Sequence, residues 1–554
     1  MKSRGGDMTH GRLVTASDAV TTAAPPPPPV AGESSAWAPL RQRAFRWLWL
    51  GVAISSIGTV MQTIGAQWLL VDAPNAAMLV GLVQAANTLP VMLLALAGGV
   101  LADSFDRRWL LFTVQTYFLI VGVLLAVLTA ARQMPAGLLL AFTFALGAGV
   151  AVQQPAWGSI IPELVPRTQL RAASRLDLVN VNLSRAVGPA LAGLVIARLG
   201  GVPVVFALNA LSVVFLAIAL LFWRRPSPRV EGPRERFVEA LRAGGRYVWH
   251  EPVVRRLMLR AILFVAPAMA LWALLPLVAS QRLGLAADGY GALFGALGVG
   301  AILGALILGR VQASLFTNGT LGAGAILYAA ALAALVVVPS FAAALLAMVF
   351  AGLPWMAVTS TLQAELQLVL PAWVRARGLA MYTVTFMGSN AVGALLWGLA
   401  ADRLGLQLAI LLAAGVMLIG VASASVLRVP ETDHLDVQPA IYWTDARLGF
   451  DPEPQSGPVL VVVHYTVAPE RQAAFLEAMG QLRRSRLRTG GTRWELYRDG
   501  ERPNRFVEIF SVASWEEHLR QHAGRLTETD RAVEEAALAF SEPPAYADHL
   551  LPPG

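Results

Sequence analysis

The chain has no cysteine and little charge. The lack of cysteine excludes disulfides, thiolate metal sites and cysteine nucleophiles. Only 14% of the 554 residues are charged and 56% are hydrophobic, whereas an average soluble domain is about 25% charged. A soluble fold of this size could not bury so much apolar surface. The composition therefore predicts a protein that is embedded in a lipid bilayer.

The seven histidines lie mostly outside the apolar stretches, so we predict no metal site and no cofactor. A net charge of +8 could indicate a nucleic-acid ligand. The arginines instead gather at the ends of apolar segments, where membrane proteins place their cations. We therefore expect no nucleic-acid partner; the expected partners are the lipid bilayer and a small-molecule substrate.

Twelve apolar segments follow a proline-rich start. Residues 1–40 contain the run Pro25–Pro29, cannot bury a core, and are expected to form a disordered cytoplasmic N-terminus without a signal peptide. Each later segment has about the 20 residues that a helix needs to cross a bilayer. The approximate spans are 46–70, 77–101, 109–131, 137–161, 176–198, 202–223, 257–280, 289–312, 319–338, 341–364, 379–400 and 406–427.

These segments predict an all-α membrane protein with twelve transmembrane helices in two six-helix, pseudo-symmetric halves. The arginines that flank them lie mostly on one side, and the other side receives only Arg132, Arg198, Arg282 and Arg403. The positive-inside rule then places both termini in the cytoplasm of a bacterial cell, with the chain in the inner membrane. The expected divisions are half 1 at 41–223, a cytoplasmic central loop at 224–256 with an amphipathic stretch at 236–248, half 2 at 257–430, a linker at 431–457 and a soluble domain at 458–545.

An internal repeat supports the two halves. Residues 184–200 read SRAVGPALAGLVIARLG and residues 389–405 read SNAVGALLWGLAADRLG. The copies lie on the fifth and eleventh segments, so a shift of six helices relates them in the same membrane direction. Packing helices rich in glycine and alanine would share this composition, but they would not share the Arg-Leu-Gly ends.

Between the second and third segments, Gly99-Val-Leu-Ala-Asp103-Ser-Phe-Asp-Arg107-Arg108 resembles the signature loop of the major facilitator superfamily. The sequence departs from it at Ser104, usually basic, and at Asp106, usually glycine. The resemblance implies a conformational latch formed by Gly99, Asp103, Arg107 and Arg108. Gly99 would allow close helix approach, and Asp103 would sit near the N-terminus of the eleventh span.

Gly188, Pro189 and Gly193 on the fifth segment resemble the later part of a glycine-proline motif of exporters in this superfamily, although Arg175 and Ser184 replace its upstream glycines. With the stretches around Gln154-Pro155 and Ile161–Pro166, the chain is similar to a bacterial subgroup of enterobactin-type siderophore and drug exporters. The resemblance implies secondary efflux of a small organic molecule by alternating access. An importer with the same fold is the alternative.

Arg185 lies about ten residues inside the fifth predicted span, too deep for its charge to reach the surface easily. A charge at that depth costs at least about 2.5–3.5 kcal/mol, so it should face a polar cavity. It could bind an anionic or catechol-like substrate, or it could bond backbone carbonyls near Pro189.

Proton coupling has no clear carrier, with Asp177 and Glu365 as weak candidates. The remaining candidates for a polar route, or for interhelical hydrogen bonds, are Asn182, Gln62, Gln84, Asn87, Gln115 and Asn390.

The polar C-terminal part predicts strands at 459–467, 492–497 and 505–512, with helices at 469–488, 515–522 and 527–540. This order suits an α+β ferredoxin-like sandwich. It resembles the small barrels related to antibiotic-biosynthesis monooxygenases. The domain has no nucleophile and base, cofactor motif or metal spacing, so we expect a regulatory or dimerising module and no enzyme. A membrane-anchored sensor or monooxygenase-like tail is the alternative.

The arginine asymmetry makes a topology prediction. Reporter fusions at Arg41, Gly232 and Gly457 should report the cytoplasm, and a fusion at Pro74 should report the opposite side. A paired reporter that is active on each side of the membrane measures this. A periplasmic signal at Gly457 would contradict the even number of spans.

Overall fold

The computed structural model describes residues 36–223, 237–425, 427–430, 436, 438–440, 448 and 450–552. Of residues 95, 96, 100, 103, 167, 237–243 and 424 it describes the backbone only. Residues 1–35 of the predicted disordered N-terminus and about half of the linker at 431–457 therefore lie outside the described residues. The prediction is wrong at residues 38–40, because Ala38–Arg41 forms a 3₁₀ turn in which Ala38 and Pro39 are buried.

The first half is a bundle of long apolar helices joined by short turns. Its chain begins with a 3₁₀ turn at Ala38–Arg41 and then forms α1 (Arg43–Leu69), α2 (Ala76–Ser104), α3 (Arg107–Ala130), α4 (Ala136–Leu164), α5 (Leu170–Arg198) and α6 (Val202–Phe222). Helices are the natural solution in lipid because each satisfies its own backbone hydrogen bonds. The six predicted segments of this half each coincide with one helix.

The second half repeats this pattern with two irregularities. Its helices are α7 (Phe237–His250), α8 (Pro252–Leu277), α9 (Ala287–Val337), α10 (Phe341–Val369), α11 (Ala372–Leu404) and α12 (Leu406–Ala422). The 51-residue α9 would be about 77 Å long if straight. Phe316, with φ of 52°, breaks it near the middle, so the predicted segments 289–312 and 319–338 are its two arms. Within the described residues, ten helices are long and apolar enough to cross a membrane, and the 17-residue α12 is a shorter apolar helix.

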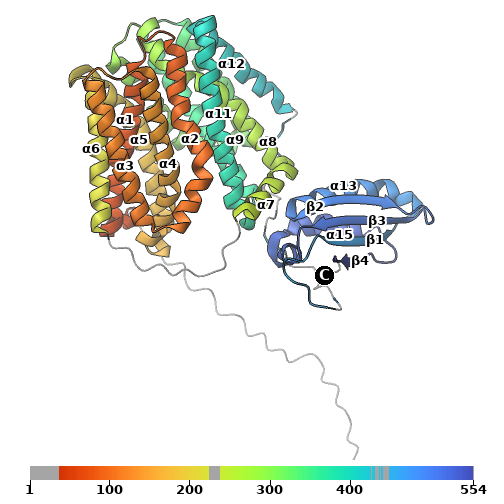
Figure 1. The fold of residues 1–554 in the computed structure, drawn as a ribbon. Coiled ribbons are helices and arrows are strands. Elements are labelled where there is room, and N and C mark those ends of the chain that lie inside the picture. Colours follow the sequence, from red (N-terminus) through yellow and green to blue (C-terminus); the bar gives the residue numbers. More distant parts are fainter. Residues whose placement is uncertain are drawn as a thin grey trace, which may run out of the picture.

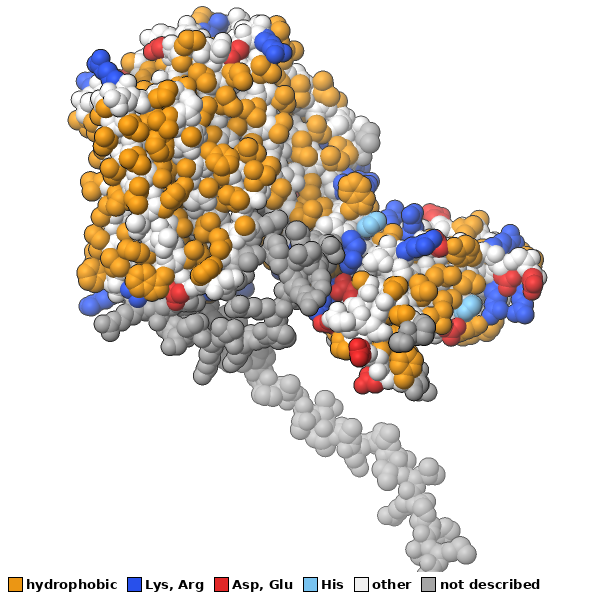
Figure 2. Space-filling view, in the orientation of Figure 1, with side chains coloured by type: hydrophobic (Ala, Val, Ile, Leu, Met, Phe, Trp, Pro, Cys, Tyr) orange, Lys and Arg blue, Asp and Glu red, His pale blue; other side chains and the backbone are white. Residues whose placement is uncertain are grey.

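The two halves stand side by side, and the soluble domain lies next to one end of the bundle, near α7 (Figure 1). We call this the domain end and the opposite one the far end. Hydrophobic side chains cover the visible flank of the bundle, while charged side chains appear at its two ends and over the soluble domain (Figure 2). Leu211, Leu306 and Ile419 are among the large apolar residues that are exposed on the helices. Such a coat is expected of helices that face lipid.

The soluble domain is a four-stranded antiparallel sheet with helices. Its elements are β1 (Val459–Thr466), α13 (Gln472–Thr489), β2 (Gly491–Arg498), β3 (Arg505–Val512), α14 (Trp515–Arg520), a π-helical turn η6 (Gln521–Arg525), α15 (Glu528–Leu538) and β4 (Tyr546–Leu550). The strand order is β2-β3-β1-β4. The predicted boundary at residue 545 omitted β4. This five-residue edge strand is polar and mostly exposed, so it lacks the apolar alternation that identifies strands in a sequence.

A buried ion pair network lies in the core of this domain. Arg486 contacts Glu508 at 3.2 Å and Glu534 at 2.7 Å, and Glu508 also accepts hydrogen bonds from Tyr465 and Trp494, each at 2.8 Å. Glu508 is fully buried. A buried charge is tolerated only when its partners satisfy it, and here they do. The network is therefore a structural element of the core.

Candidate transport site and the contacts that close it

Arg185 lines a pocket formed between the two halves. With Asn182 it comes from the middle of α5, and the remaining lining residues come from α8, α9 and α10 of the second half: Trp272, Leu297, Gly298, Ala301, Ile302, Trp355, Met356 and Thr359. The cavity measures about 40 Å³, room for about two or three water molecules. The Arg185 side chain is accessible rather than packed away. The deep cation therefore faces a small space between the halves whose lining is mostly apolar, with Asn182 and Thr359 as its other polar side chains.

Aromatic rings form the second-half wall of this pocket. Trp272 and Trp355 lie 5.4 Å apart between ring centroids, and Trp355 continues to Phe386 at 6.2 Å. Trp272 also lies 5.4 Å from Phe294. A guanidinium on one wall and large rings on the other match an anionic group and a flat apolar body in chemistry. At about 40 Å³ the cavity is too small for such a ligand in this conformation.

The two halves touch closely near the far end, where glycines replace side chains. A Cβ added at Gly193 would lie 2.4 Å from the carbonyl oxygen of Ala287, and one at Gly81 would lie 2.5 Å from that of Ala394. The glycines thus let α5 meet α9 and α2 meet α11 backbone to backbone. Small residues are the usual means of close helix approach in lipid. These contacts close the far end in this conformation.

The internal repeat makes matching contacts in both halves. Gly193 faces α9 across the interface, and its repeat partner Gly398 faces Ala77 and Met78 of α2. Gly188 packs on α1, where an added Cβ would lie 2.8 Å from Val60, and its partner Gly393 packs on α8 near Ala266. Of the exporter-like residues, Gly188 and Gly193 therefore have packing roles, while Pro189 offers its carbonyl at the contact with Gly291.

Polar groups reinforce the far-end closure. The Asp402 carboxylate accepts a hydrogen bond of 3.1 Å from the Met78 amide, in the first turn of α2. That turn begins at Asn75, whose own side chain caps nothing, so α11 supplies a capping carboxylate across the interface. Gln67 also spans the halves: it donates to the Trp272 carbonyl at 3.3 Å and accepts from the Tyr290 hydroxyl at 2.8 Å.

Sequence reasoning missed these two residues as contacts between the halves. Asp402 lies beside Arg403 at a helix end, where a charged pair needs no further explanation. Gln67 is an ordinary polar residue of the first span. For Asp402 the repeat did contain a signal: the first copy has Ala197 at the matching position, so the packing of the repeat does not require a carboxylate there.

The other predicted polar residues do not line the pocket at Arg185. Gln62 and Asn209 hydrogen-bond each other, and Asn87 donates to Thr63 at 3.3 Å. They surround a separate cavity of about 20 Å³ within the first half, so they serve as interhelical hydrogen bonds there.

Three further candidates also lie apart from the Arg185 pocket. Asn390 donates to the Phe386 carbonyl of its own helix at 2.7 Å. Gln115 is fully buried in α3, and Gln84 is half-buried in α2. Asn182 is the one that shares the pocket with Arg185, and it also donates to the Leu178 carbonyl at 2.9 Å.

The signature loop lies at the domain end. Arg107 contacts Glu163 of α4 at 2.7 Å, and Arg108 donates to the carbonyls of Leu220 and Leu221 at 2.8 Å, at the end of α6. Both arginines thus hold helices of their own half. Among the described residues, a Cβ at Gly99 would meet no atom within 4 Å, so the expected close approach at Gly99 is not made in this conformation. The side chain of Asp103 lies outside the described residues.

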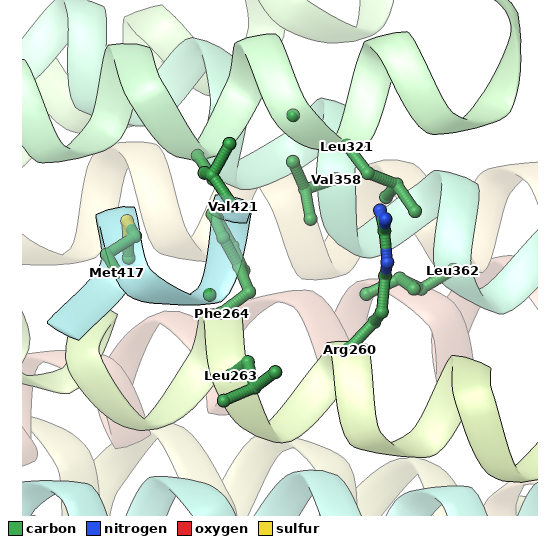
Figure 3. Close-up of a pocket in the computed structure, with 11 residues that line it drawn as sticks. Arg260, Leu263, Phe264, Leu321, Val358, Leu362, Met417 and Val421 are labelled. Atoms are coloured by element: carbon green, nitrogen blue, oxygen red, sulfur yellow. The ribbon is translucent and has the colours of Figure 1, made fainter. Parts of the chain in front are cut away.

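A second deep arginine, Arg260, lies within the second half. The predicted seventh span began at 257, but α8 begins at Pro252, so Arg260 sits deeper than the sequence suggested. Figure 3 shows it beside a small apolar pocket, near Leu321 and Leu362. Its Nε donates to the Leu427 carbonyl at 3.2 Å. It therefore ties α8 to the segment after α12 and takes no part in the pocket at Arg185.

The soluble domain docks on the second half through charged and aromatic side chains. The Trp373 indole of α11 donates to the Arg525 carbonyl at 3.1 Å, and the Arg525 guanidinium lies 4.9 Å over the Trp373 ring. Glu517 pairs with Arg525 at 2.5 Å and with Arg246 of α7 at 3.1 Å. Burial raises the pKa of Glu517, but the bonds and charge of Arg525 outweigh it, so the pKa falls and the carboxylate is ionised at pH 7.

A second ionic contact lies beside this one. Arg488 of α13 contacts Asp530 at 2.7 Å and also Glu251, the N-cap of α8. All three groups are largely buried, where an ion pair is screened little by salt. The amphipathic stretch predicted at 236–248 corresponds to α7, which packs against α11, near Arg377, and against α13.

Two helical halves that meet at one end and enclose a pocket lined from both are the architecture of a membrane transporter. Residues 34–548 match the model of the family described as transmembrane secretion effector (MFS_3). The chain belongs to this family of major facilitator transporters. The matched range also contains most of the soluble domain.

Curated relatives match parts of the chain. It is 26% identical over 142 residues to the staphyloferrin A transporter of Staphylococcus aureus (strain NCTC 8325 / PS 47), 26% of this chain and 36% of the relative. It is 24% identical over 236 residues to macrolide efflux protein A of Streptococcus pyogenes, 42% and 58% of the two chains. It is 27% identical over 214 residues to the multidrug efflux pump Tap of Mycobacterium tuberculosis (strain ATCC 25618 / H37Rv), 37% and 50%. The chain thus spans about a third to three fifths of these relatives.

Solved structures share the fold. An inward-facing, occupied bacterial homolog of the human lysosomal transporter Spinster gives a TM-score of 0.57 at 16% identity, covering 70% of this chain and 97% of that one. A D-xylose-proton symporter gives 0.57 at 14% identity, covering 71% and 99%. Identities this low establish the fold alone.

The far-end contact makes a prediction. In Gly193→Val, the new side chain would overlap α9, at a cost of about 1–3 kcal/mol, and should shift the population away from far-end closure by about five- to 150-fold. Spin labels at Pro74 and Arg403, on a chain that has no other cysteine, should report a longer distance. Gly415→Val is the control, because a Cβ at Gly415 meets no described atom within 4 Å. An unchanged distance distribution in Gly193→Val would contradict this role.

The contact between the soluble domain and α11 makes a second prediction. Trp373→Ala removes both the indole hydrogen bond and the ring under Arg525, without changing the soluble domain. Labels at Arg493 and Arg403 should then give a broader distance distribution than in the parent protein. Trp249→Ala is the matched control, because Trp249 of α7 is 70% exposed. Equal broadening in both variants would show that the docking does not depend on Trp373.

Proposed function

We propose that this protein is a twelve-span exporter of small organic molecules that works by alternating access. The observation that carries the proposal is the pocket at Arg185, mid-membrane and lined from both halves, beneath a closed far end. Twelve spans follow if the two arms of α9 and the shorter α12 each cross the membrane. Both termini and the soluble domain are then cytoplasmic, in line with the arginine asymmetry.

The substrate we propose is anionic and carries a flat apolar or aromatic body. Arg185 would bind the anionic part, and Trp272 and Trp355 would contact the ring. A charge at this depth is costly when unpaired, so a substrate anion would add the partner that the pocket itself does not supply from its described lining. The names of the relatives, a siderophore transporter and two efflux proteins, favour export over import.

Proton coupling forms part of the proposal. One of the solved neighbours is a proton symporter. Asp177, which accepts from the Trp157 indole at 2.9 Å, and Glu365, which accepts from Thr317 at 2.5 Å, are the candidate carriers. Both bonds link neighbouring helices, so a change of protonation would alter helix packing.

For the soluble domain we propose a ferredoxin-like sandwich with a regulatory role. The βαββαβ order with strands arranged β2-β3-β1-β4 suits this fold. The carboxylate that could act as a base, Glu508, is fully buried and fully bonded, which favours a regulatory module over a monooxygenase. Docking on α7, α8 and α11 would bias the position of the second half. Dimerisation through this domain stays a prediction.

Arg185 provides the test of transport. Arg185→Gln should abolish efflux because it removes the charge, and Arg185→Lys should keep part of it. The measurement is accumulation of a catecholate siderophore, which combines anionic groups with aromatic rings, in cells that express each variant, with membrane abundance determined in parallel. Arg198→Gln, an exposed arginine at the far end of the same helix, is the control and should transport normally.

Two results would contradict this role. Normal efflux by Arg185→Gln would show that the charge is not needed. Loss of Arg185→Gln from the membrane, with normal activity per molecule of the remaining protein, would assign Arg185 to folding.

A further inference from the structure

Three histidines from two separate segments of the soluble domain come together. His518 lies on α14, His522 one turn later in η6, and His549 on the edge strand β4. Their ligand nitrogens all lie within 4.8 Å of one another, and the Nε2 atoms of His518 and His522 are 3.2 Å apart. A spacing of four residues places both side chains on one face of a helix. The transport function makes no use of this cluster.

We propose that His518, His522 and His549 form a binding site for one divalent transition-metal ion of the Zn²⁺ class. Nitrogens bound tetrahedrally at about 2.0–2.1 Å from Zn²⁺ lie about 3.3–3.4 Å from each other. The His518–His522 pair already has nearly this separation. His549 needs to approach by a movement on the order of 1 Å, which its half-exposed side chain can make.

The surroundings of His518 favour a ligand role for its Nε2. Its Nδ1 lies 3.3 Å from the Gln521 amide oxygen, so a proton on Nδ1 is donated to Gln521 and the Nε2 lone pair is directed at the cluster. Metal-bound histidines are oriented by such a bond on the other nitrogen.

The donor set selects the class of metal. The cluster consists of imidazoles only, which suit Zn²⁺, Cu²⁺, Ni²⁺ and Co²⁺, whereas Mg²⁺ and Ca²⁺ require oxygen ligands. The adjacent Asp548 points to the other face of β4, where it pairs with His464 at 3.4 Å. His518 is 1% exposed and packs on Trp515 at 5.4 Å between ring centroids. The ion would enter past His522 and His549 and keep one position open to solvent.

The site shares its segment with the docking contact. Glu517 and Arg525, which bind α7 and α11, flank His518 and His522 in the short stretch formed by α14 and η6. A metal that ties this stretch to β4 would fix the geometry of both docking residues. Metal occupancy would therefore bias docking, a consequence that rests on the regulatory role proposed above, whereas the metal site itself does not.

The test uses the full-length protein in detergent, purified through a tag without histidine. Titration with Zn²⁺ by calorimetry should show that one equivalent binds. Addition of Co²⁺ should produce visible d–d absorption bands of a Co²⁺ ion bound by nitrogen ligands. His522→Gln and His549→Gln should each lower the affinity by at least about tenfold. Both side chains are half-exposed, so these variants avoid the buried His518. His464→Gln on β1 is the control and should bind as the parent protein does.

Two outcomes would overturn the proposal. One is the absence of stoichiometric Zn²⁺ binding by the parent protein. The other is equal affinity in the parent protein and the His522→Gln/His549→Gln double variant, which would place any binding elsewhere. If the metal binds as expected but the distance distribution between labels at Arg493 and Arg403 does not respond, the site stands and its link to docking fails.

Discussion

Close backbone contact between the two halves is the constraint on which this structure depends. Lipid tails are as apolar as leucine, so there is no hydrophobic drive for one half to associate with the other. Association must come from van der Waals contact and interhelical hydrogen bonds, and both require short distances. Gly81, Gly193 and Gly398 provide them by leaving the backbone bare at the far end. The two halves can also separate at each of these glycine contacts, as alternating access requires.

Hydrogen bonds between polar groups add specific, directional interactions to the backbone contact between the halves. Asp402 caps the first turn of α2 from the opposite half, and Gln67 joins Trp272 and Tyr290. Separation of the halves at the far end would break these bonds, so they would contribute to the free energy difference between closed and open conformations. The signature loop at the domain end carries Asp103 at the C-terminal end of α2. Asp402 occupies the corresponding C-terminal end of α11.

Among the residues that the structure describes, the soluble domain makes its ion pairs and its indole hydrogen bond with α7, α8 and α11, on the side of the second half. These contacts combine ion pairs that are largely buried with a cation over a tryptophan ring, which salt weakens little. Anything that reshapes α14 and η6 therefore acts at the interface with the transporter. The three histidines lie in this stretch and on β4.

Individual residues show which features of the candidate site could be predicted from the sequence. The depth of Arg185 could be predicted because charge is rare in an apolar span. Its place between the two halves, in a mostly apolar pocket, came only from the structure. Gln62, Asn87 and Gln115 were equally polar, yet they lie inside the first half and away from the pocket. Nothing in a linear pattern distinguishes a polar residue that faces its own bundle from one that faces the other half, since both lie on the same helix.

The sequence by itself determined the membrane class, the order of the apolar segments, the repeat and most elements of the soluble domain, because each depends on local hydrophobicity and periodicity. Only the tertiary structure decided that Asp402 caps α2, that Trp373 meets Arg525, and that His549 joins His518 and His522. These partners are far apart in the chain. Their meeting depends on how whole helices and strands pack, and the edge strand that carries His549 has too little apolar pattern to be recognised before it is paired with β1.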